Sequence, residues 1–295
     1  MNLVVDLGQS GARFKVGDEI RKTNIAKNSS EELVQTLSRI FKEVPAGRYE
    51  NIYLSLTGLQ GEVGDPRPFG ELCSQSFDAK KVFVMDDGIA SYLGALGKKS
   101  GVVLTLGGGV VAISCKDGAF GHADGKGPIF GDFGGGFWIG QKGLQKVIAT
   151  IDGRDADFSL VDFMQIELSQ HKSLINKTGV EASQLCISSA KKIVDGAQNG
   201  ITSAQEILNE GAQYLAKTIF AAWQKVKGDS KIEPYLAIQG GLSRSEYYVN
   251  QITKELEKLM AFQFTVGAGD HIVGALIAAE LYPSGVDPLM KVWSA

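Results

Sequence analysis

One order of strands and helices occurs twice along this chain. Apolar runs predict strands, and apolar residues three or four positions apart predict helices. In the first hundred residues the predicted strands are 2–6, 12–17, about 19–25, 51–57 and 81–85. The predicted helices are a segment that carries Leu33, Leu37, Ile40 and Phe41, a short one after Pro68, and 88–97. Their order along the chain is βββαβαβα.

The second half of the chain repeats this order. Its predicted strands are 101–106, 109–115, 119–123, 235–239 and 262–266. Its predicted helices are about 136–150, 244–259 and 269–282, with further inserted helices, the longest at about 203–227. Because strands alternate with helices, we expect an α/β fold of two duplicated βββαβαβα lobes. Ligands of such sheets bind beyond the carboxyl ends of the strands, so we also expect a cleft between the lobes.

The boundary between the halves is expected at the short polar segment Gly97-Lys-Lys-Ser-Gly101. The predicted N-terminal lobe covers residues 1–99, and the predicted C-terminal lobe covers 100–282 with a helical insertion at about 155–230. Helices at about 283–295 are expected to pack back on the first lobe. The apolar face of the longest inserted helix predicts either core or a dimer surface, and its residues are Leu208, Tyr214, Leu215, Ile219 and Trp223.

Charge and cysteine content narrow the class of protein. The 295 residues carry a net charge of −3 with both signs interspersed, which is not the basic surface that nucleic acid or an anionic membrane attracts. No apolar run approaches the roughly 18 residues of a membrane span, and a strand follows Met1 without a signal-peptide pattern. Cys73, Cys115 and Cys186 are far apart, which predicts buried thiols. We expect a cytoplasmic protein that binds neither nucleic acid nor membrane.

Glycines are concentrated between Gly125 and Gly140, around the single acidic residue Asp132. An ordered glycine costs conformational entropy, so such a cluster marks left-handed turns or backbone that approaches a ligand closely. An ordinary loop is the alternative. Glycine turns also follow the first strand of each half, at 8–11 and at 107–109. Turns that expose backbone amides at strand ends are natural phosphate sites.

Five segments together resemble the BadF/BadG/BcrA/BcrD-type ATPase family, within the actin/hexokinase/Hsp70-type phosphotransferase superfamily. The branch that they resemble contains N-acetylglucosamine kinase and bacterial glucosamine kinase. The segments are DLGQSGARFKV (6–16), MDDGIASYLGAL (85–96), DGKGPIFGDFGGGFWIG (124–140), AIQGGLS (237–243) and AGDHIVGALIAAELY (268–282). They occur in the order and at about the spacing of the family. The resemblance implies ribonuclease H-like lobes of the actin/hexokinase type and an ATP-dependent sugar kinase.

The resemblance assigns the first glycine turn to the transferring phosphates. Gly8, Gln9, Ser10 and Gly11 would bind ATP, and Asp6 at the end of the first strand would help to place Mg²⁺. An ordinary hairpin would account for the glycines. It would not account for an aspartate at the end of an apolar run.

Two adjacent acids, Asp86 and Asp87, follow the strand at 81–85 and precede a helix. One interpretation is a helix cap with a first-turn charge. The resemblance implies instead that Asp87 is the general base that takes the proton of the sugar hydroxyl. Asp86 would replace a neighbouring asparagine of the substrate site. Phosphorylation of a sugar needs such a carboxylate within hydrogen-bond reach of the hydroxyl.

The resemblance places two more glycine segments around the nucleotide. Gly107, Gly108 and Gly109 match a second phosphate loop, and Gly240 with Gly241 matches the loop on which adenosine lies. The second phosphate loop departs from the family, because glycine and valine replace both of its hydroxyl residues. Only backbone amides would then cradle the phosphates.

The predicted sugar contacts come from two further segments. Asp132 and Gly127 match a sugar-contacting segment, and Thr57 with Gly58 matches a second loop, for which a plain strand-end turn is the alternative. Lys126 replaces a frequent tryptophan. A lysine in the site would favour a carboxylate or a phosphate over a protonated amino sugar, and a solvent-facing lysine is the alternative.

The sequence therefore predicts an ATP-dependent kinase that phosphorylates glucosamine or N-acetylglucosamine, by analogy at the 6-hydroxyl, with ATP and Mg²⁺ as cofactors. We expect a homodimer. One alternative is a catalytically weak nucleotide or sugar sensor. The other is an ATPase activator of a 2-hydroxyacyl-CoA dehydratase, which would need a cysteine motif for an iron–sulfur cluster. His122, His171 and His271 share no motif, so neither a metal cluster nor a catalytic triad is predicted.

Overall fold

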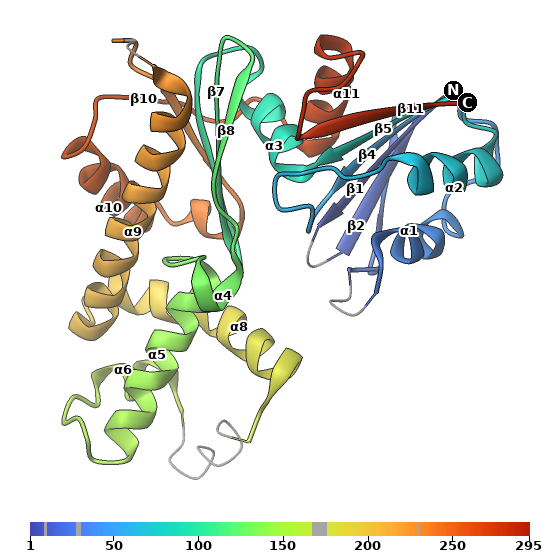
Figure 1. The fold of residues 1–295 in the computed structure, drawn as a ribbon. Helices are drawn as coiled ribbons and strands as arrows, with labels where there is room; N and C mark the ends of the chain where they lie inside the picture. Colours follow the sequence, from blue (N-terminus) through green and yellow to red (C-terminus); the bar gives the residue numbers. More distant parts are fainter. Residues whose placement is uncertain (9–10, 28–30, 167–175, 229–230) are drawn as a thin grey trace. The chain divides into compact units, whose positions relative to one another are not determined.

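A mixed six-stranded sheet builds the first of two compact units in the computed structural model (Figure 1). The structure describes residues 1–8, 11–27, 31–166, 176–228 and 231–295. The first unit comprises Met1–Lys99 and Val266–Ala295, and the second comprises Ser100–Thr265.

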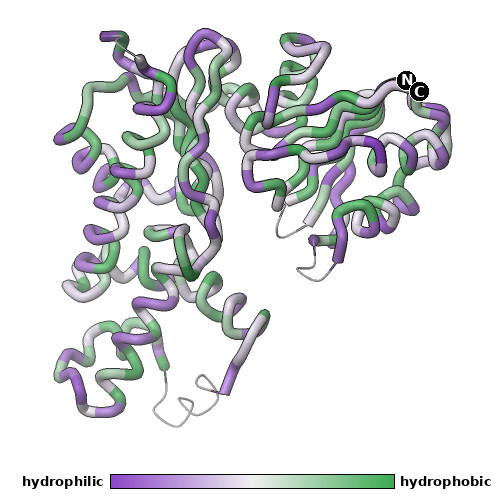
Figure 2. Tube along the Cα trace, in the orientation of Figure 1, coloured by the Kyte–Doolittle hydropathy of each residue, from purple (hydrophilic) through white to green (hydrophobic). Residues whose placement is uncertain are grey.

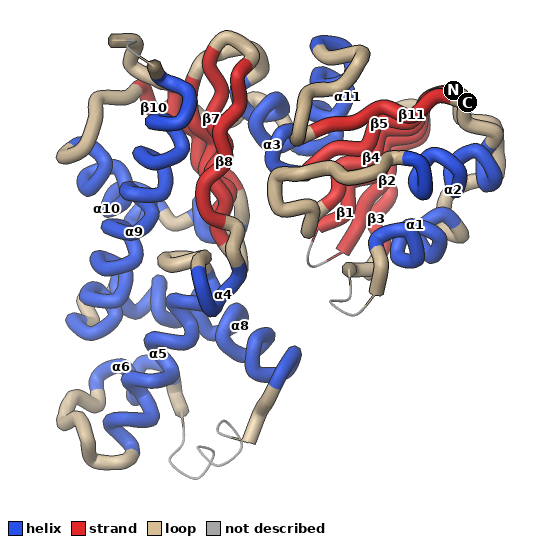
Figure 3. Tube along the Cα trace, viewed as in Figure 1, coloured by secondary structure: helices blue, strands red, loops and turns tan. Residues whose placement is uncertain are grey.

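The sheet of the first unit has the strand order β11-β5-β4-β1-β2-β3. Strands β1, β4 and β5 are mutually parallel, whereas β2, β3 and β11 join antiparallel to their neighbours. The bounds are β1 (Asn2–Gly8), β2 (Gly11–Val16), β3 (Glu19–Thr23), β4 (Asn51–Leu56), β5 (Lys81–Asp86) and β11 (Met290–Ser294). Helices α1 (Leu33–Phe41) and α2 (Arg67–Phe77) cover one face of this sheet, and α3 (Asp87–Leu96) and α11 (His271–Leu281) cover the other (Figure 3).

The side chains of β1 alternate between two different environments. Leu3, Val5 and Leu7 are fully buried in the core under α1 and α2. Successive side chains of a strand point to opposite faces, so Val4 and Asp6 lie on the side of α3 and α11. Figure 2 shows hydrophobic stretches among the strands of this unit, and β1, β4 and β5 are the mostly apolar and buried ones. Asp6 is therefore a charged exception on an otherwise apolar strand.

The second unit repeats the topology of the first. Its sheet has the order β10-β9-β6-β7-β8, in which β9 and β10 run parallel to β6 while β7 and β8 run antiparallel to their neighbours. The strands are β6 (Gly101–Leu106), β7 (Val110–Lys116), β8 (Ala119–Asp124), β9 (Tyr235–Gln239) and β10 (Gln263–Phe264). The same order in the first unit, β5-β4-β1-β2-β3, confirms the duplicated α/β fold predicted from the sequence.

Helices supply most of the core of the second unit. They are α4 (Gly127–Phe130), α5 (Gly136–Ile151), α6 (Ser159–Met164), α8 (Gly179–Gln198), α9 (Thr202–Lys227), the 3₁₀ turn η2 (Gly241–Arg244) and α10 (Glu246–Glu257). Leu208, Leu215, Ile219 and Trp223 of α9 are buried in this core, whereas Tyr214 is exposed. The apolar face was predicted to be either core or a dimer surface, and these four residues belong to the core. Within the described ranges, no helix combines the length and apolarity that a bilayer span needs.

Two predictions about the end of the chain are wrong. Residues 290–294 form strand β11 on the edge of β5, not a helix. Val292 and Trp293 suit a strand, and Trp293 packs so closely on Gly70 that a Cβ there would lie 2.1 Å from its ring. Helix α11 also belongs to the first unit, although the prediction placed 266–282 in the second.

Close backbone contact with α3 explains why α11 belongs to the first unit. A Cβ on Gly94 would lie 2.2 Å from the carbonyl oxygen of Asp270, and one on Gly274 would lie 1.7 Å from that of Ala90. Glycines at these positions let the two helices approach at backbone distance. Ile272, Ala275 and Ala278 are buried in the same helix. The small residues of this segment thus serve helix packing.

We expect Gly274→Ala to destabilise the protein by roughly 2 kcal/mol, as overpacking of a well-packed core does. Alanine favours a helix over glycine by about 1 kcal/mol, so a net loss would show that steric overlap dominates. Thermal unfolding of both proteins measures the effect. Gly64→Ala is the matched control, because a Cβ there meets nothing within 4 Å. An unchanged midpoint for Gly274→Ala would contradict the proposed packing.

Candidate active site

The carboxyl ends of three parallel strands meet at one edge of the first unit. Asp6 of β1 is in register with Ser55 of β4, and Leu56 is in register with Asp86 of β5. Asp6, Ser55 and Asp86 are buried although they are polar. Buried polar groups need partners, so this edge has to be a connected polar network.

Asp6 is the centre of that network. One carboxylate oxygen, Oδ2, accepts a hydrogen bond from Arg13 Nε at 2.9 Å. The other, Oδ1, accepts one from Ser55 Oγ at 3.1 Å and lies 3.1 Å from His271 Nδ1. Burial alone would raise the pKa of Asp6, but His271 and Arg13 outweigh burial and hold it below its ordinary value. Asp6 is thus held ionised by the Arg13 guanidinium and the His271 imidazole.

Asp270 extends the network to the start of α11. Its Oδ2 accepts from Arg13 Nη1 at 2.6 Å, and its Oδ1 accepts from the backbone amides of Ile272 and Val273 at 3.1 and 3.2 Å. Asp270 is therefore the N-cap of α11, which satisfies two of the amides that a helix start leaves unpaired. Because His271 follows it directly, the cap fixes the backbone from which the imidazole projects.

Asp86 caps α3. Its two oxygens accept hydrogen bonds from the amides of Gly88 at 2.9 Å and Gly61 at 3.0 Å. The cap, which was one of the two interpretations of the paired acids, therefore holds for Asp86. With both oxygens bonded to backbone, Asp86 fixes the turn that carries Asp87, and this geometry gives no support to its predicted contact with a substrate.

Asp87 is the first residue of α3 and is only partly buried. Burial raises the pKa of Asp87 to about 7, and the negative charge of Asp86 adds to this effect. His271 and a hydrogen bond from the side chain of Thr57 act in the opposite direction. The predicted site residue Thr57 thus lies beside Asp87. A carboxylate with a pKa near 7 is suited to accept a proton at neutral pH.

Sequence reasoning missed two members of this site, Arg13 and His271. Arg13 had a signal: a hairpin that pairs Gly8 with Gly11 also places Arg13 opposite Asp6. His271 had none, because it reaches Asp6 only through the packing of α11. Burial alone would lower the pKa of His271, whereas Asp6 and Asp87 raise it above its ordinary value.

The arrangement around Asp6 does not fit a directly bound Mg²⁺. Mg²⁺ requires near-ideal octahedral oxygen ligands at about 2.0–2.1 Å. Arg13, Ser55 and His271 already fill three of the roughly four lone-pair sites of the Asp6 carboxylate, and the Arg13 cation would repel an ion at the remaining one. In the described part of the chain, no group of three or more acidic, histidine or cysteine side chains is placed to hold a metal ion.

Gly8, Gly11 and Gly58 lie at or beyond the ends of strands. Gly8 and Gly11 face each other at the end of the β1–β2 hairpin, while Gln9 and Ser10 lie outside the described residues. Gly58 has a φ of 85°, a left-handed conformation that favours glycine, and a Cβ there would lie 3.1 Å from Lys27.

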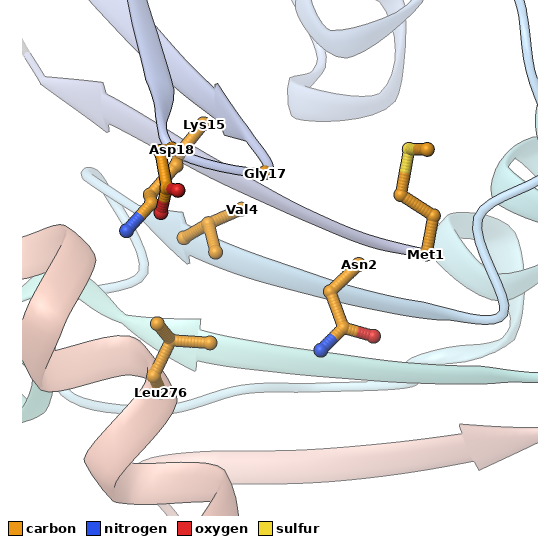
Figure 4. Close-up of a pocket in the computed structure, with 7 residues that line it drawn as sticks. All are labelled: Met1, Asn2, Val4, Lys15, Gly17, Asp18 and Leu276. Atoms are coloured by element: carbon orange, nitrogen blue, oxygen red, sulfur yellow. The ribbon is translucent and has the colours of Figure 1, made fainter.

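A shallow cavity of about 280 Å³ opens elsewhere on the first unit (Figure 4). It lies at the amino-terminal end of β1, with Met1, Asn2 and Val4 in its wall. Lys15, Gly17, Asp18 and Leu276 complete the wall. Ligands of α/β sheets bind at the carboxyl ends of the strands, which is the opposite end from this cavity.

In the second unit, Asp132 and the predicted phosphate loop lie side by side. A Cβ on Gly109 would lie 2.6 Å from Asp132 Oδ2, so glycine is needed at 109 for this approach. Asp132 has a left-handed φ of 61°, and its amide donates to Asp124 Oδ1 at 2.8 Å. Its Oδ1 is buried and makes no hydrogen bond within the described residues. Burial and the neighbouring Asp124 raise the pKa of Asp132 to about 6.

The three glycine segments of the second unit also meet at strand ends. The amides of Gly136 and Phe137, at the start of α5, donate to the carbonyls of Gly107 and Gly108 at 2.8 and 2.9 Å. A Cβ on Gly240 would lie 2.4 Å from the carbonyl of Leu106, which ends β6. The predicted phosphate loop and the predicted adenosine loop are therefore neighbours at the carboxyl ends of β6 and β9.

Gly127 lies beside Asp132, because its backbone makes a hydrogen bond to the Asp132 carboxylate that lowers the pKa of that group. Gly127 has a φ of 79°, and a Cβ there would meet nothing within 4 Å. Lys126 is exposed, and it lines a shallow cavity of about 360 Å³ together with Asp124, Phe133, Tyr214 and Lys217.

The cysteines do not form a cluster. Cys73 and Cys115 are buried, as expected, in different units, and Cys186 is partly exposed. Burial raises the pKa of Cys73 to about 12, which keeps that thiol protonated. This arrangement gives no support to the activator of a dehydratase.

Solved structures share this fold at low sequence identity. A Chromobacterium violaceum protein described as a candidate N-acetylglucosamine kinase has a TM-score of 0.69 and 20% identity, over 94% of this chain and 97% of that one. A glucokinase of the ROK family from Streptomyces griseus, in complex with glucose and AMPPNP, has a TM-score of 0.60 and 15% identity, over 96% and 99%. At such identities these structures show the fold alone.

Sequence comparison gives the family. An N-acetylmuramic acid/N-acetylglucosamine kinase from Clostridium acetobutylicum is 25% identical over 193 residues, which are 62% of this chain and 60% of that protein. The match thus spans about three fifths of the length of this curated relative. The model of the BadF/BadG/BcrA/BcrD ATPase family matches residues 5–276. The chain belongs to the BadF/BadG/BcrA/BcrD ATPase family.

Proposed function

We propose that this protein is an ATP-dependent kinase of an amino sugar, N-acetylglucosamine or glucosamine, and that it phosphorylates the 6-hydroxyl. The observation that carries the proposal is Asp87, a carboxylate at the carboxyl end of β5 whose pKa of about 7 suits a general base. Membership of an ATPase family supports the use of ATP. The predicted cytoplasmic location, where ATP is available, agrees with this proposal.

In the proposed reaction, Asp87 accepts the proton of the sugar hydroxyl as its oxygen attacks the γ-phosphoryl group of ATP. Thr57 orients the Asp87 carboxylate, and Asp86 fixes the turn below it. The glycine segments at 107–109 and 240–241 bind the nucleotide through backbone groups. Mg²⁺ enters this reaction with ATP, as part of that substrate, because no group of three or more acidic, histidine or cysteine side chains among the described residues is placed to hold a resident ion. The cleft between the lobes and the homodimer stay predictions.

The proposed sugar contact in the second unit is Asp132. Its buried Oδ1 lacks a partner within the described chain, and a sugar hydroxyl would supply one. The curated relative acts on N-acetylmuramic acid and N-acetylglucosamine, so an acidic amino sugar is a further candidate. Lys126 gives this candidate no support, because its exposure agrees with the alternative of a solvent-facing lysine.

The alternative is a catalytically weak sensor. It is favoured by the loss of both hydroxyl residues from the loop at 107–109. A panel of glucosamine, N-acetylglucosamine, N-acetylmuramic acid, anhydro-muramic acid, N-acetylmannosamine and glucose, assayed with ATP and Mg²⁺, separates the two. ADP release with one amino sugar supports the kinase. A thermal shift with a sugar but no turnover supports the sensor.

We expect Asp87→Asn to lower kcat by at least about 100-fold, because it removes the general base. Affinity for ATP should change less than about threefold, as measured by isothermal titration. Asp18→Asn, an exposed acid in the β2–β3 turn, is the control and should retain full activity. An Asp87→Asn protein that keeps more than a tenth of the parent kcat would remove Asp87 from this role.

As Asp87 ionises with rising pH, activity should increase while the stability of the fold decreases. The base must be ionised, so kcat/KM should rise with pH through about 7. Because the folded pKa is raised above the ordinary value of 3.8, ionisation of Asp87 destabilises the fold increasingly between about pH 4 and pH 7. Relative to the parent, Asp87→Asn should therefore gain stability across this window, by about 2 kcal/mol at pH 7.5.

Urea unfolding of parent and Asp87→Asn at several pH values measures this difference. A difference that stays constant from pH 4 to pH 8 would show that the carboxyl of Asp87 titrates normally. The Asp18→Asn control should show no such trend.

A further inference from the structure

The two oxygens of Asp6 hold two different cationic side chains in place. Arg13 Nε bonds to Oδ2 at 2.9 Å, and His271 Nδ1 lies 3.1 Å from Oδ1, which also accepts from Ser55. These partners fill three of the roughly four lone-pair sites of the carboxylate, and an ion bound at the remaining site of Oδ2 would lie beside the Arg13 cation, which repels it. The contacts that the structure shows therefore compete with a metal-ligand role for Asp6.

Asp270, at the start of α11, is the second carboxylate that Arg13 contacts. Arg13 joins Asp6 of β1 to Asp270, with contacts of 2.9 and 2.6 Å, and Asp270 caps α11 through the amides of Ile272 and Val273. His271 is thus fixed twice, by its backbone through the cap and by its ring through Asp6. Its side chain is 24% exposed, so the imidazole is held in place without being sealed from solvent.

The fixed imidazole lies at the same sheet edge as Asp87, because Asp6 stands near the end of β1 and Asp87 follows the end of β5 in the same series of parallel strands. The charge of Asp87 also raises the pKa of His271. The acids that face this position are Asp6, Asp86 and Asp87, and the cations are His271 and Arg13. Arg13 already pairs with Asp6 and Asp270, and Asp86 is bonded to backbone amides. Among the side chains of this network, the imidazole of His271, whose pKa is raised, is therefore the one left to interact with the carboxylate of the proposed base.

We propose that Asp6 is a positioning residue that holds His271 at the sheet edge where Asp87 begins α3, and not a ligand of Mg²⁺. This inference rests on the proposed function, in which Asp87 is the general base. Asp6 acts through the ring of His271, and His271 acts through the carboxylate of Asp87. Loss of either member should therefore impair the same step.

A double-mutant cycle tests this coupling. Asp6→Asn, His271→Gln and the double variant are compared with the parent, with His122→Gln as a control histidine of the second unit. We expect each single variant to lower kcat about tenfold or more with KM for ATP changed less than about threefold. The kcat of the double variant should be about equal to that of the less active single variant, because the effects of coupled residues are not additive. Independent losses that multiply would overturn the proposal.

A second measurement separates this role from a metal site. The Mg²⁺ concentration that gives half-maximal activity, at fixed total ATP, should stay within about twofold of the parent in Asp6→Asn. Binding of Mn²⁺ to the nucleotide-free protein, followed by electron paramagnetic resonance, should be equally weak in the parent and in Asp6→Asn. A tenfold higher Mg²⁺ requirement in Asp6→Asn, or tight Mn²⁺ binding that Asp6→Asn abolishes, would show that Asp6 is a metal ligand and would contradict the proposal.

A readout without activity keeps the two proposals distinguishable. If the parent phosphorylates no sugar of the panel, the proposed function fails while the network is still testable by NMR of ¹⁵N-labelled histidine. The ring signals of His271, assigned by their loss in His271→Gln, should shift in both Asp6→Asn and Asp87→Asn. The signals of His122 should stay in place. Unchanged His271 signals in either variant would overturn the positioning role.

Discussion

The candidate active site depends on the contact of α11 with α3 at backbone distance. Gly94 and Gly274 leave no room for a side chain between these helices, and the start of α11 is thereby placed against the end of β1. Asp270 and His271 reach Arg13 and Asp6 only because of this placement. The last helix of the second duplicated segment thus completes the polar edge of the first sheet.

The carboxyl ends of β1, β4 and β5 bury more carboxylates than cationic side chains, and this imbalance sets the pKa values of the acids there. Asp6 is compensated by Arg13 and His271 and stays ionised, whereas Asp86 is compensated by two backbone amides. Asp87 receives less compensation, so burial dominates and its pKa rises to about 7. Neighbouring acids of one type therefore take three roles, because each environment stabilises the charge differently.

In the second unit, glycines allow loops to approach one another closely, as Gly94 and Gly274 allow α3 and α11 to do in the first. Gly109 leaves room for the carboxylate of Asp132, and Gly240 leaves room for the end of β6. The glycines that the family uses around a nucleotide are thus also required by the contacts between these loops. The Gly-Gly-Gly-Val segment keeps this packing although it has lost two hydroxyl groups, so its departure from the family pattern is compatible with the fold.

The sequence by itself determined the duplicated order of elements and the family, because hydrophobic periodicity and glycine turns are local properties. It also singled out Asp6 at the end of an apolar strand, Asp87 at the start of a helix and Asp132 within a glycine-rich segment. The register of the first hairpin made the pairing of Arg13 with Asp6 readable from residues 6–13. Tertiary structure alone decided that α11 packs in the first unit and that residues 290–294 pair with β5. It alone decided that His271 contacts Asp6, 265 positions away, since a contact across such a separation leaves no periodic trace in one sequence.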